Sequence, residues 1–265
     1  MSVTLHLGDC LEVMKGMDAG SIDLTVTSPP YDNLRDYDGT YDHNDLDWRA
    51  VIKQLYRITA QGGVVVWVVS DATEDGTESG TSFAQTLYAK EIGFNLHDTM
   101  IYEIAGTGAK GSNYAYWQSF EYMFVWSKGV PKTVNRIADR KNVRAGTQVT
   151  RGQKTKHVGT RLGEYMVLDI GVRSNVWRYH AGNNGDPGSD HPAPFPLQLA
   201  KDHINSWSAP GDTVLDCFLG SGTTGIAAMQ TARKFVGIEI YAEYFAIAQR
   251  RIEQAQWQLP LLEVA

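Results

Sequence analysis

The sequence predicts an α/β fold built on one mostly parallel β-sheet. Short apolar segments typical of strands alternate along the chain with segments whose apolar residues recur at helical spacing. The chain has 265 residues, of which 43% are hydrophobic, enough for one large α/β domain or two small ones. Strands near residues 96–104 and 122–126 follow one another without a helix between them, which makes them candidates for an antiparallel pair.

The first strand is short and lies at residues 5–7. It ends at Gly8-Asp9-Cys10, so the Asp9 carboxylate follows the carboxyl end of a strand. Ligands of open parallel sheets bind at that edge. Asp9 is therefore a candidate ligand contact.

A second strand, at residues 22–27, runs into the corner Ser28-Pro29-Pro30-Tyr31. Proline has no N–H for a sheet ladder, and the residue before it avoids the α conformation, so the corner leaves the sheet stiff and extended. The Ser28 hydroxyl and the Pro29 carbonyl would then offer two acceptors beside the Tyr31 ring, an arrangement that suits a planar amine. A proline-rich loop that only ends a strand is the alternative interpretation.

A helix and a buried strand are predicted next. Apolar residues recur at helical spacing within residues 48–58. Gly62-Gly63 is expected to end this helix before a nearly all-apolar strand at residues 64–69.

The following stretch, residues 70–82, consists mostly of Gly, Asp, Glu, Ser and Thr, so a flexible surface loop is predicted there. Phe83, Leu87 and Ile92 then recur at helical spacing. These three residues are expected to form the apolar face of the next helix.

Positive charge is concentrated in one part of the chain. The formal net charge is −6, yet residues 128–178 carry 12 Lys and Arg against 3 Asp and Glu, and the remainder carries 12 against 27. A basic segment in an otherwise acidic chain is typical of a region that binds along a phosphate backbone. A solvated basic loop without a partner is the alternative. Because this stretch shows no clear periodicity, we predict an inserted region, which ends in the turn-rich residues 183–188.

The most informative motif lies near the end of the chain, after a predicted helix at residues 197–207. A strand at residues 213–215 leads into Asp216-Cys-Phe-Leu-Gly220-Ser-Gly222-Thr-Thr-Gly225, and a helix follows. Glycine is needed where backbone turns tightly and approaches a ligand closely. The next strand ends in Glu239, 23 residues after Asp216, where a carboxylate can hold ribose hydroxyls.

Two cofactors compete for this motif, NAD and S-adenosylmethionine. The acidic side chain of Asp216 within the turn would repel a pyrophosphate but attract the amino group and the sulfonium of S-adenosylmethionine. A glycine-rich turn with a purely structural role is the remaining alternative. The acid therefore favours S-adenosylmethionine.

Together these motifs resemble a known family, the amino-group DNA methyltransferases of prokaryotes and phages, in the subgroup whose catalytic half precedes the cofactor half. The resemblance covers most of the chain. It implies a Rossmann-like S-adenosylmethionine-dependent methyltransferase fold, α/β with a circularly permuted motif order and an inserted recognition region. The implied cofactor contacts are Asp9 toward adenine, Phe195 and Gln198 on the helix before the glycine loop, Asp216, Phe218, Gly220 and Gly222 around methionine, and Glu239 on the ribose.

The resemblance also implies a mechanism in which Ser28, Pro29, Pro30 and Tyr31 form the catalytic motif. The target base would be flipped out of the duplex and stacked on Tyr31, and the Ser28 and Pro29 acceptors would draw its amine hydrogens out of plane. In the family, Ser at this position is more frequent in cytosine-N4 enzymes and Asp or Asn in adenine-N6 enzymes. Cytosine-N4 is therefore favoured, with adenine-N6 as the alternative.

The resemblance implies three regions and a double-stranded DNA partner. Residues 1–127 would be the catalytic half, 128–185 the inserted target-recognition region and 186–265 the cofactor-binding half. The candidate DNA-binding residues are eight of the cations of the insert: Arg136, Arg140, Lys141, Arg144, Arg151, Lys154, Lys156 and Arg161.

Other function classes are less well supported by the sequence. Methylation of RNA or protein, or a non-catalytic DNA-binding module, stays open. Methylation at cytosine carbon-5 needs a cysteine nucleophile, and neither Cys10 nor Cys217 follows a proline as that nucleophile does. His180, His191 and His203 show no metal-ligand spacing, so no metal site is predicted.

The remaining expectations concern location and partners. No apolar run approaches the ~18 residues of a membrane span, and the first residues do not resemble a signal peptide, which predicts a cytoplasmic protein without membrane contact. A homodimer and a separate restriction endonuclease are the further partners that the family resemblance leaves open.

Overall fold

The computed structural model describes residues 2–30, 46–105, 116–150, 164–180 and 196–262. The chain divides into two compact units, one formed by Met1–Asn135 with Asn175–Ala265 and the other by Arg136–Ser174. The second unit is shorter than the inserted region expected at residues 128–185, because residues 128–135 and 175–180 belong to the first unit. The functional division into three regions stays a prediction.

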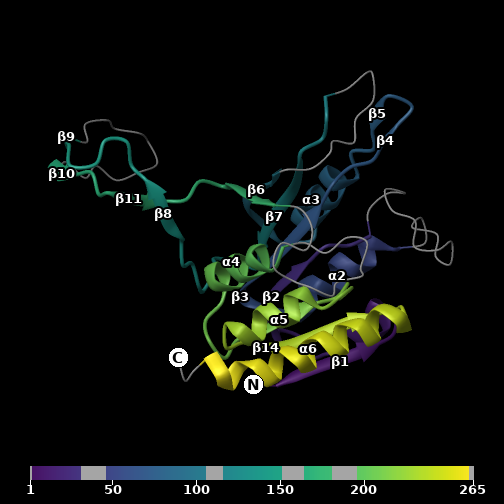
Figure 1. The fold of residues 1–265 in the computed structure, drawn as a ribbon. Coiled ribbons are helices and arrows are strands. Elements are labelled where there is room, and N and C mark those ends of the chain that lie inside the picture. Colours follow the sequence, from purple (N-terminus) through teal and green to yellow (C-terminus); the bar gives the residue numbers. More distant parts are fainter. Residues whose placement is uncertain (1, 31–45, 106–115, 151–163, 181–195, 263–265) are drawn as a thin grey trace. The chain divides into compact units, whose positions relative to one another are not determined.

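The first unit is built on an eight-stranded sheet with the order β1-β14-β13-β2-β3-β7-β6-β12 (Figure 1). Neighbouring strands are parallel, except that β7 runs antiparallel to both β3 and β6. The predicted mostly parallel sheet and its antiparallel pair are therefore confirmed. The strands are β1 (Val3–Leu7), β2 (Ile22–Thr27), β3 (Thr59–Val69), β6 (Asn95–Ala105), β7 (Phe120–Ser127), β12 (Val176–His180), β13 (Thr213–Asp216) and β14 (Lys234–Glu239).

Helices pack against this sheet in two groups. α1 (Cys10–Lys15), α2 (Trp48–Ile58) and α3 (Thr81–Glu91) follow one another in contact, as do α4 (Leu197–Trp207), α5 (Thr223–Gln230) and α6 (Ala242–Leu262). Successive strand residues point to opposite faces, so β3 can supply both sides of the core. Val65 and Trp67 of β3 belong to the apolar cluster that the first group of helices covers. α4 also contacts β2 and β3.

The strand β3 begins earlier than the sequence predicted. α2 ends at Ile58 and β3 starts at Thr59, so Gly62 and Gly63 lie within the strand instead of ending the helix. A Cβ at Gly63 would lie 2.9 Å from the Ala60 carbonyl oxygen and 2.8 Å from a Thr59 methyl. Glycine is required there because the backbone has no room for a side chain.

The helix predicted around Phe83, Leu87 and Ile92 is confirmed as α3, and Ile92 at its end packs against the core, but the other two residues do not form a buried face. Phe83 and Leu87 are 46% and 65% exposed, whereas the polar residues Gln85 and Ser82 face the interior. Buried polar groups are tolerated when they are hydrogen-bonded. Gln85 Oε1 accepts a hydrogen bond of 2.8 Å from the indole N–H of the buried Trp67. Helical spacing therefore located this helix but did not identify the polar residues that it buries.

The segment before α3, predicted as a flexible surface loop, is exposed in its middle part but not at its beginning. It contains a short hairpin of β4 (Thr73–Glu74) and β5 (Thr77–Glu78), and its first residues, Ser70 and Asp71, are buried. Asp71 accepts hydrogen bonds from the backbone N–H of Ser82 at 2.8 Å and from its hydroxyl at 2.6 Å. The carboxylate thus satisfies a donor at the start of α3, as a capping residue does.

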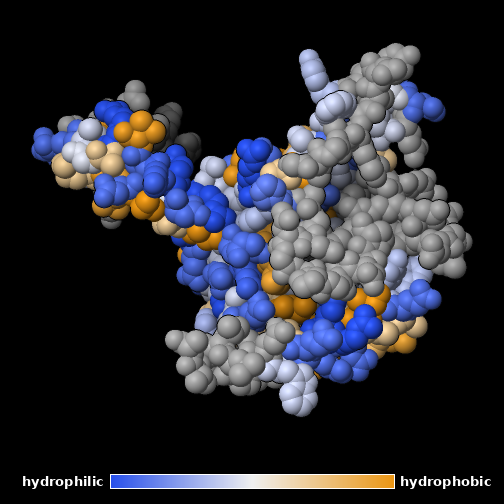
Figure 2. Space-filling model, in the orientation of Figure 1, coloured by the Kyte–Doolittle hydropathy of each residue, from blue (hydrophilic) through white to orange (hydrophobic). Residues whose placement is uncertain are grey.

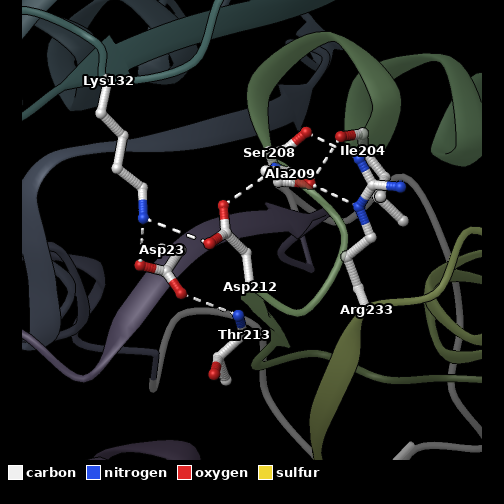
Figure 3. A network of polar contacts seen from close by, with 8 residues as sticks. All are labelled: Asp23, Lys132, Ile204, Ser208, Ala209, Asp212, Thr213 and Arg233. Carbon is white, nitrogen blue, oxygen red and sulfur yellow. Dashed lines mark hydrogen bonds and ion pairs between the residues drawn. The ribbon is translucent and has the colours of Figure 1, made fainter.

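A polar network joins the amino ends of β2 and β13 (Figure 3). The ammonium of Lys132 lies 2.7 Å from Asp23 Oδ1 and 3.3 Å from Asp212 Oδ1. The second oxygen of Asp23 accepts a hydrogen bond of 2.8 Å from the backbone N–H of Thr213. Because the network lies at the amino ends of these strands, it stabilises the edge of the sheet opposite the predicted site.

The second unit consists of short antiparallel strand pairs, where the sequence showed no periodicity. β8 (Ala138–Lys141) pairs with β11 (Ile170–Val172), and β9 (Gln148–Thr150) pairs with β10 (Glu164–Met166). None of the residues whose burial is described in this unit is buried. Strands that bury neither face have no alternation of apolar and polar residues, which explains the missing pattern.

Candidate functional site

Four neighbouring strands end beside one another at the carboxyl edge of the sheet. Leu7 of β1 pairs with Glu239 of β14, and Asp216 of β13 pairs with Gly237 of β14. β2 lies on the other side of β13. α5 leads from β13 to β14 while α2 leads from β2 to β3, so the strand order reverses between β13 and β2. Ligands of open α/β sheets bind at such a switch point.

The two motifs that the sequence analysis singled out meet at this switch point. The Thr27 hydroxyl, which directly precedes the Ser-Pro-Pro corner, donates a hydrogen bond of 2.7 Å to Asp216 Oδ1 across 189 residues of sequence. Ser28 and Pro30 are partly exposed and Pro29 is buried. Tyr31, the fourth predicted catalytic residue, lies outside the described residues.

Asp216 is a buried carboxylate surrounded by neutral donors. Its Oδ1 accepts hydrogen bonds from the Thr27 hydroxyl and from the Phe218 N–H at 3.1 Å, and its Oδ2 accepts one from the Thr224 hydroxyl at 2.7 Å. Burial raises the pKa of Asp216, and these hydrogen bonds oppose the increase. No cation among these partners neutralises the carboxylate, which therefore favours a positively charged ligand nearby.

The glycine loop, residues 217–222 between β13 and α5, has an unusual backbone conformation and is hydrogen-bonded to Glu239. Gly220 and Gly222 have φ angles of +51° and +83°, a region that other residues rarely adopt. The buried Glu239 accepts hydrogen bonds from the N–H of Gly220 at 2.8 Å and of Tyr241 at 3.0 Å. Burial raises the pKa of Glu239, and the bonds to backbone amides lower it. The predicted ribose acid thus also ties the end of β14 to the glycine loop.

Phe218 sits in the loop between Asp216 and Gly220 and is half-buried. Its ring meets the buried indole of Trp67 edge-on, with centroids 6.2 Å apart, and Trp67 in turn stacks on Trp126 at 5.3 Å. Such aromatic pairs add about 0.5–1.5 kcal/mol each beyond their buried area. The aromatic column therefore supports the glycine loop from β3 and β7.

Asp9 caps a helix at the outer part of this edge. Its Oδ1 accepts hydrogen bonds from the N–H groups of Leu11 at 2.8 Å and Glu12 at 3.1 Å, at the start of α1. The neighbouring Gly8 N–H donates to the Glu239 carbonyl at 2.8 Å. The cap explains the choice of Asp structurally, and it holds the carboxylate at the same edge as Glu239.

The predicted contacts from the helix before the glycine loop are only partly described. Phe195 lies outside the described residues, and Gln198 is exposed near the start of α4. The Gln198 amide donates a hydrogen bond of 2.7 Å to Asp202, whose other oxygen accepts one of 2.6 Å from the Tyr179 hydroxyl. Gln198 is therefore oriented by α4 and β12.

The predicted DNA-binding cations lie in the second unit. Arg136, Arg140, Lys141 and Arg144 are exposed, and Arg151, Lys154, Lys156 and Arg161 lie outside the described residues. Exposed apolar residues accompany the cations, so hydrophilic and hydrophobic surface alternate over this unit (Figure 2). These apolar residues are Val143, Tyr165, Met166, Leu168, Ile170 and Val172.

Sequence reasoning missed several residues at the carboxyl edge. Leu7 and Ile240 flank Glu239 and are 53% and 44% exposed, which provides apolar surface for a ring beside the acid. Thr223, the first residue of α5, is buried, and its hydroxyl has no hydrogen-bond partner among the described residues. Their position next to the predicted motifs was the only signal that could have identified them.

The cysteine thiols are unsuited to nucleophilic chemistry. Cys10 and Cys217 are both buried and unpaired. Burial raises the pKa of Cys10 to about 12 and raises that of Cys217 well above its ordinary value. Since the thiolate is the reactive form, neither residue can serve as a nucleophile near neutral pH. Among the described residues, no group of three His, Cys, Asp or Glu could hold a metal ion, and no helix is long and apolar enough to cross a membrane.

The sequence matches the family described as DNA methylase over residues 22–250. It is 47% identical over 256 residues to the orphan methyltransferase M.BamHII of Bacillus amyloliquefaciens, an alignment that covers 94% of this chain and 91% of that protein. It is 29% identical to the DNA adenine methyltransferase YhdJ of Escherichia coli K12, covering 95% of this chain and 83% of the relative.

Two solved structures show the same fold. The putative DNA modification methylase TTHA0409 from Thermus thermophilus, complexed with S-adenosyl-L-methionine, aligns with a TM-score of 0.61 and 25% identity over 96% of each chain. The cytosine-N4-specific PvuII DNA methyltransferase aligns with a TM-score of 0.68 and 19% identity, over 97% of this chain and 92% of that one. The family match spans most of the chain. The protein therefore belongs to the DNA methylase family, the S-adenosylmethionine-dependent methyltransferases that act on exocyclic amino groups of DNA bases.

Proposed function

We propose that this protein transfers a methyl group to the N4 amine of cytosine in double-stranded DNA. The proposal rests mainly on one observation. At the switch point of the sheet, the hydrogen bond from Thr27 to Asp216 joins the strand ends from which the Ser28 corner and the glycine loop begin. A methyl donor and an amine acceptor must come together at one point, and this edge is where the two motifs lie side by side.

The residues at the carboxyl edge fit S-adenosylmethionine. Glu239, held by two backbone amides, is suited to accept hydrogen bonds from ribose hydroxyls. Leu7 and Ile240 offer apolar surface to the adenine ring, with Asp9 nearby as an acceptor for its amine. The Thr223 hydroxyl at the start of α5, which has no partner in the described part of the chain, can donate to the carboxylate of the methionine moiety.

When bound, the cofactor supplies an electrophilic methyl group on a positively charged sulfur. The uncompensated carboxylate of Asp216 favours this charge at the loop. Positive charge at the site also lowers the pKa values of Asp216 and Glu239, both of which burial raises. Cofactor affinity should therefore weaken as pH falls and these carboxyls become protonated.

The Ser28 corner would prepare the amine. An exocyclic amine is a poor nucleophile because its lone pair is delocalised into the base. The Ser28 hydroxyl and the Pro29 carbonyl would accept hydrogen bonds from its N–H groups and turn the lone pair toward the methyl group, while Tyr31 would stack on the flipped base. Catalysis then comes from positioning and preorganised dipoles.

The serine at the corner supports cytosine as the target. Adenine-N6 methylation is the second candidate, because the relative YhdJ, at 29% identity, is described as a DNA adenine methyltransferase. The cations of the second unit, together with its exposed apolar residues, support this unit as the face that meets duplex DNA. We place this activity in the cytoplasm, where chromosomal and phage DNA are accessible.

Partners other than DNA are hypotheses. The relative M.BamHII is described as an orphan methyltransferase, which favours action without a paired restriction endonuclease. A homodimer is testable by light scattering on the purified protein across a range of concentrations. A single monomer mass throughout that range would exclude it.

The deciding experiment is incubation with mixed-sequence duplex DNA and S-adenosylmethionine that carries a deuterated methyl group, followed by digestion and mass spectrometry of the nucleosides. Deuterated N4-methylcytosine is the expected product. Deuterated N6-methyladenine would keep the reaction and change the base, and no labelled nucleoside would refute the proposal. A Ser28→Ala variant, expected to lose the product while it still binds cofactor, serves as the matched control.

A further inference from the structure

The last residues of β2 and β13 are joined by a buried side-chain hydrogen bond. Thr27 ends β2 and is 0% exposed, and its hydroxyl donates to Asp216, which ends β13. The backbones of β13 and β2 pair at two positions, Val214 with Leu24 and Leu215 with Thr25. The Thr27 to Asp216 bond thus extends the connection beyond the backbone pairing, to the two points where the site loops begin.

A second hydroxyl completes this buried cluster. Thr224 of α5 donates to the other oxygen of Asp216 at 2.7 Å, and its hydroxyl also lies 3.4 Å from the Val26 carbonyl oxygen. The carboxylate therefore receives a donor from β2 on one oxygen and a donor from α5 on the other. Hydrogen bonds to a carboxylate are stronger than those between neutral groups. β2, β13 and α5 are held in one arrangement at this point.

We infer that Thr27 is a positioning residue whose bond to Asp216 sets the separation between the Ser28 corner and the glycine loop. This inference rests on the proposed function, in which the corner holds the amine and the loop holds the methyl donor. In-line transfer is sensitive to placement, since a misplacement of about 1 Å can lower a rate about 100-fold. The bond acts on catalysis without touching the reacting atoms.

The chain offers a matched control on the same strand. Thr25 lies two residues before Thr27, so its side chain is on the same face of β2, and it too is 0% exposed. Its hydroxyl has no hydrogen-bond partner among the described residues. Thr25→Val and Thr27→Val make the same change of atoms at the same burial, and only the second removes a bond to Asp216.

The test compares wild type with Thr27→Val, Thr27→Ser, Thr25→Val and Ser28→Ala. Calorimetry gives the affinity for S-adenosylmethionine and the fraction of binding-competent protein. Single-turnover methylation with enzyme in excess over a duplex and cofactor at saturation then gives the transfer rate per competent site. Thr27→Val is expected to lower this rate about 10- to 100-fold, with affinity within about 5-fold of wild type.

Two further results are expected. Thr27→Ser, which keeps the hydroxyl, should transfer within about 3-fold of the wild-type rate, and Thr25→Val should match wild type. A merely structural role for Thr27 would reduce the competent fraction and leave the rate per competent site unchanged.

The failures can be told apart. Wild-type transfer by Thr27→Val, with Ser28→Ala inactive, would overturn the inference and leave the proposed function intact. An equal loss in Thr25→Val and Thr27→Val would overturn it as well, because packing would then explain both. Wild-type transfer by Ser28→Ala would refute the catalytic role of the corner, and the inference with it.

Discussion

Replacing Gly225 by alanine should destabilise the fold without weakening cofactor binding. Gly225 belongs to the glycine motif, and the sequence pattern suggested that its backbone approaches a ligand. In the structure a Cβ at this position would lie 2.7 Å from Ile252 Cδ1 and 2.7 Å from Phe235 Cε1. Both neighbours are buried, at 2% and 1% exposure, so neither can move into solvent. The missing side chain lets α5 pack closely on α6 and β14.

The expected magnitude follows from two opposing effects. Overpacking a well-filled core costs about 1–3 kcal/mol, whereas alanine is favoured over glycine within a helix by about 0.5–1 kcal/mol. The difference lies between about 0 and 2.5 kcal/mol, so Gly225→Ala should lower the free energy of unfolding by a central value of about 1.3 kcal/mol. With an m-value of about 3 kcal/mol/M, the urea midpoint should fall by about 0.4 M.

The assay is equilibrium urea unfolding followed by circular dichroism, with S-adenosylmethionine affinity measured in parallel. Ile252→Val, which removes the clashing Cδ1, should cost about 0.5–1.5 kcal/mol alone. Combined with Gly225→Ala it should cost less than the sum of the two single changes, because one clash disappears. An unchanged midpoint together with a loss of affinity greater than about 10-fold would refute the packing argument.

Three further predictions concern charge. Asp216→Ala should weaken cofactor binding, because it removes the carboxylate that favours a cation, and undiminished affinity by calorimetry would contradict that role. Burial lowers the pKa of His203 from its ordinary value of 6.5 to about 3, so the unfolded chain takes up a proton below pH 6.5 while the folded chain does not. As the pH falls from 6 to 4, the free energy of unfolding of wild type should therefore decrease by about 1.4 kcal/mol per pH unit more than that of His203→Phe. Urea unfolding at several pH values measures both, and an equal dependence on pH in the two proteins would show that the folded histidine is protonated. Changing Arg140 and Arg144 together to Gln should reduce the slope of log affinity for duplex DNA against log salt concentration by up to ~1.8, and an unaltered slope would mean that these residues do not meet phosphates.

Local patterns located several elements. The β-branched and apolar residues of β2 and the predicted helix at residues 197–207 gave the observed positions of β2 and α4, whereas the apolar run at residues 64–69 gave only the second half of β3. Local patterns did not identify the buried face of α3, because Gln85 and Ser82 are buried only through partners elsewhere in the chain, Trp67 and Asp71. A polar residue with a distant partner is indistinguishable in sequence from one that faces water.

The candidate site shows the same division. The residue types at strand ends selected Asp9, Ser28, Asp216 and Glu239 as candidates, and the structure places all four at the carboxyl edge of the sheet. Two of these acids also have structural roles that the sequence did not predict. Asp9 caps α1, and Glu239 accepts a hydrogen bond from the Gly220 amide. Both roles depend on which backbone N–H groups lie next to each carboxylate in the folded chain.

The sequence by itself determined the type of sheet, the order of the motifs and the chemistry that they favour, because strand character, glycine turns and charge are properties of neighbouring residues. Only the tertiary structure decided that Thr27 reaches Asp216 and that Gly225 is needed for packing. Those contacts join segments far apart in the chain, and their geometry is set by how β2, β13 and α6 pack together. The order of residue types along the chain does not specify such distances.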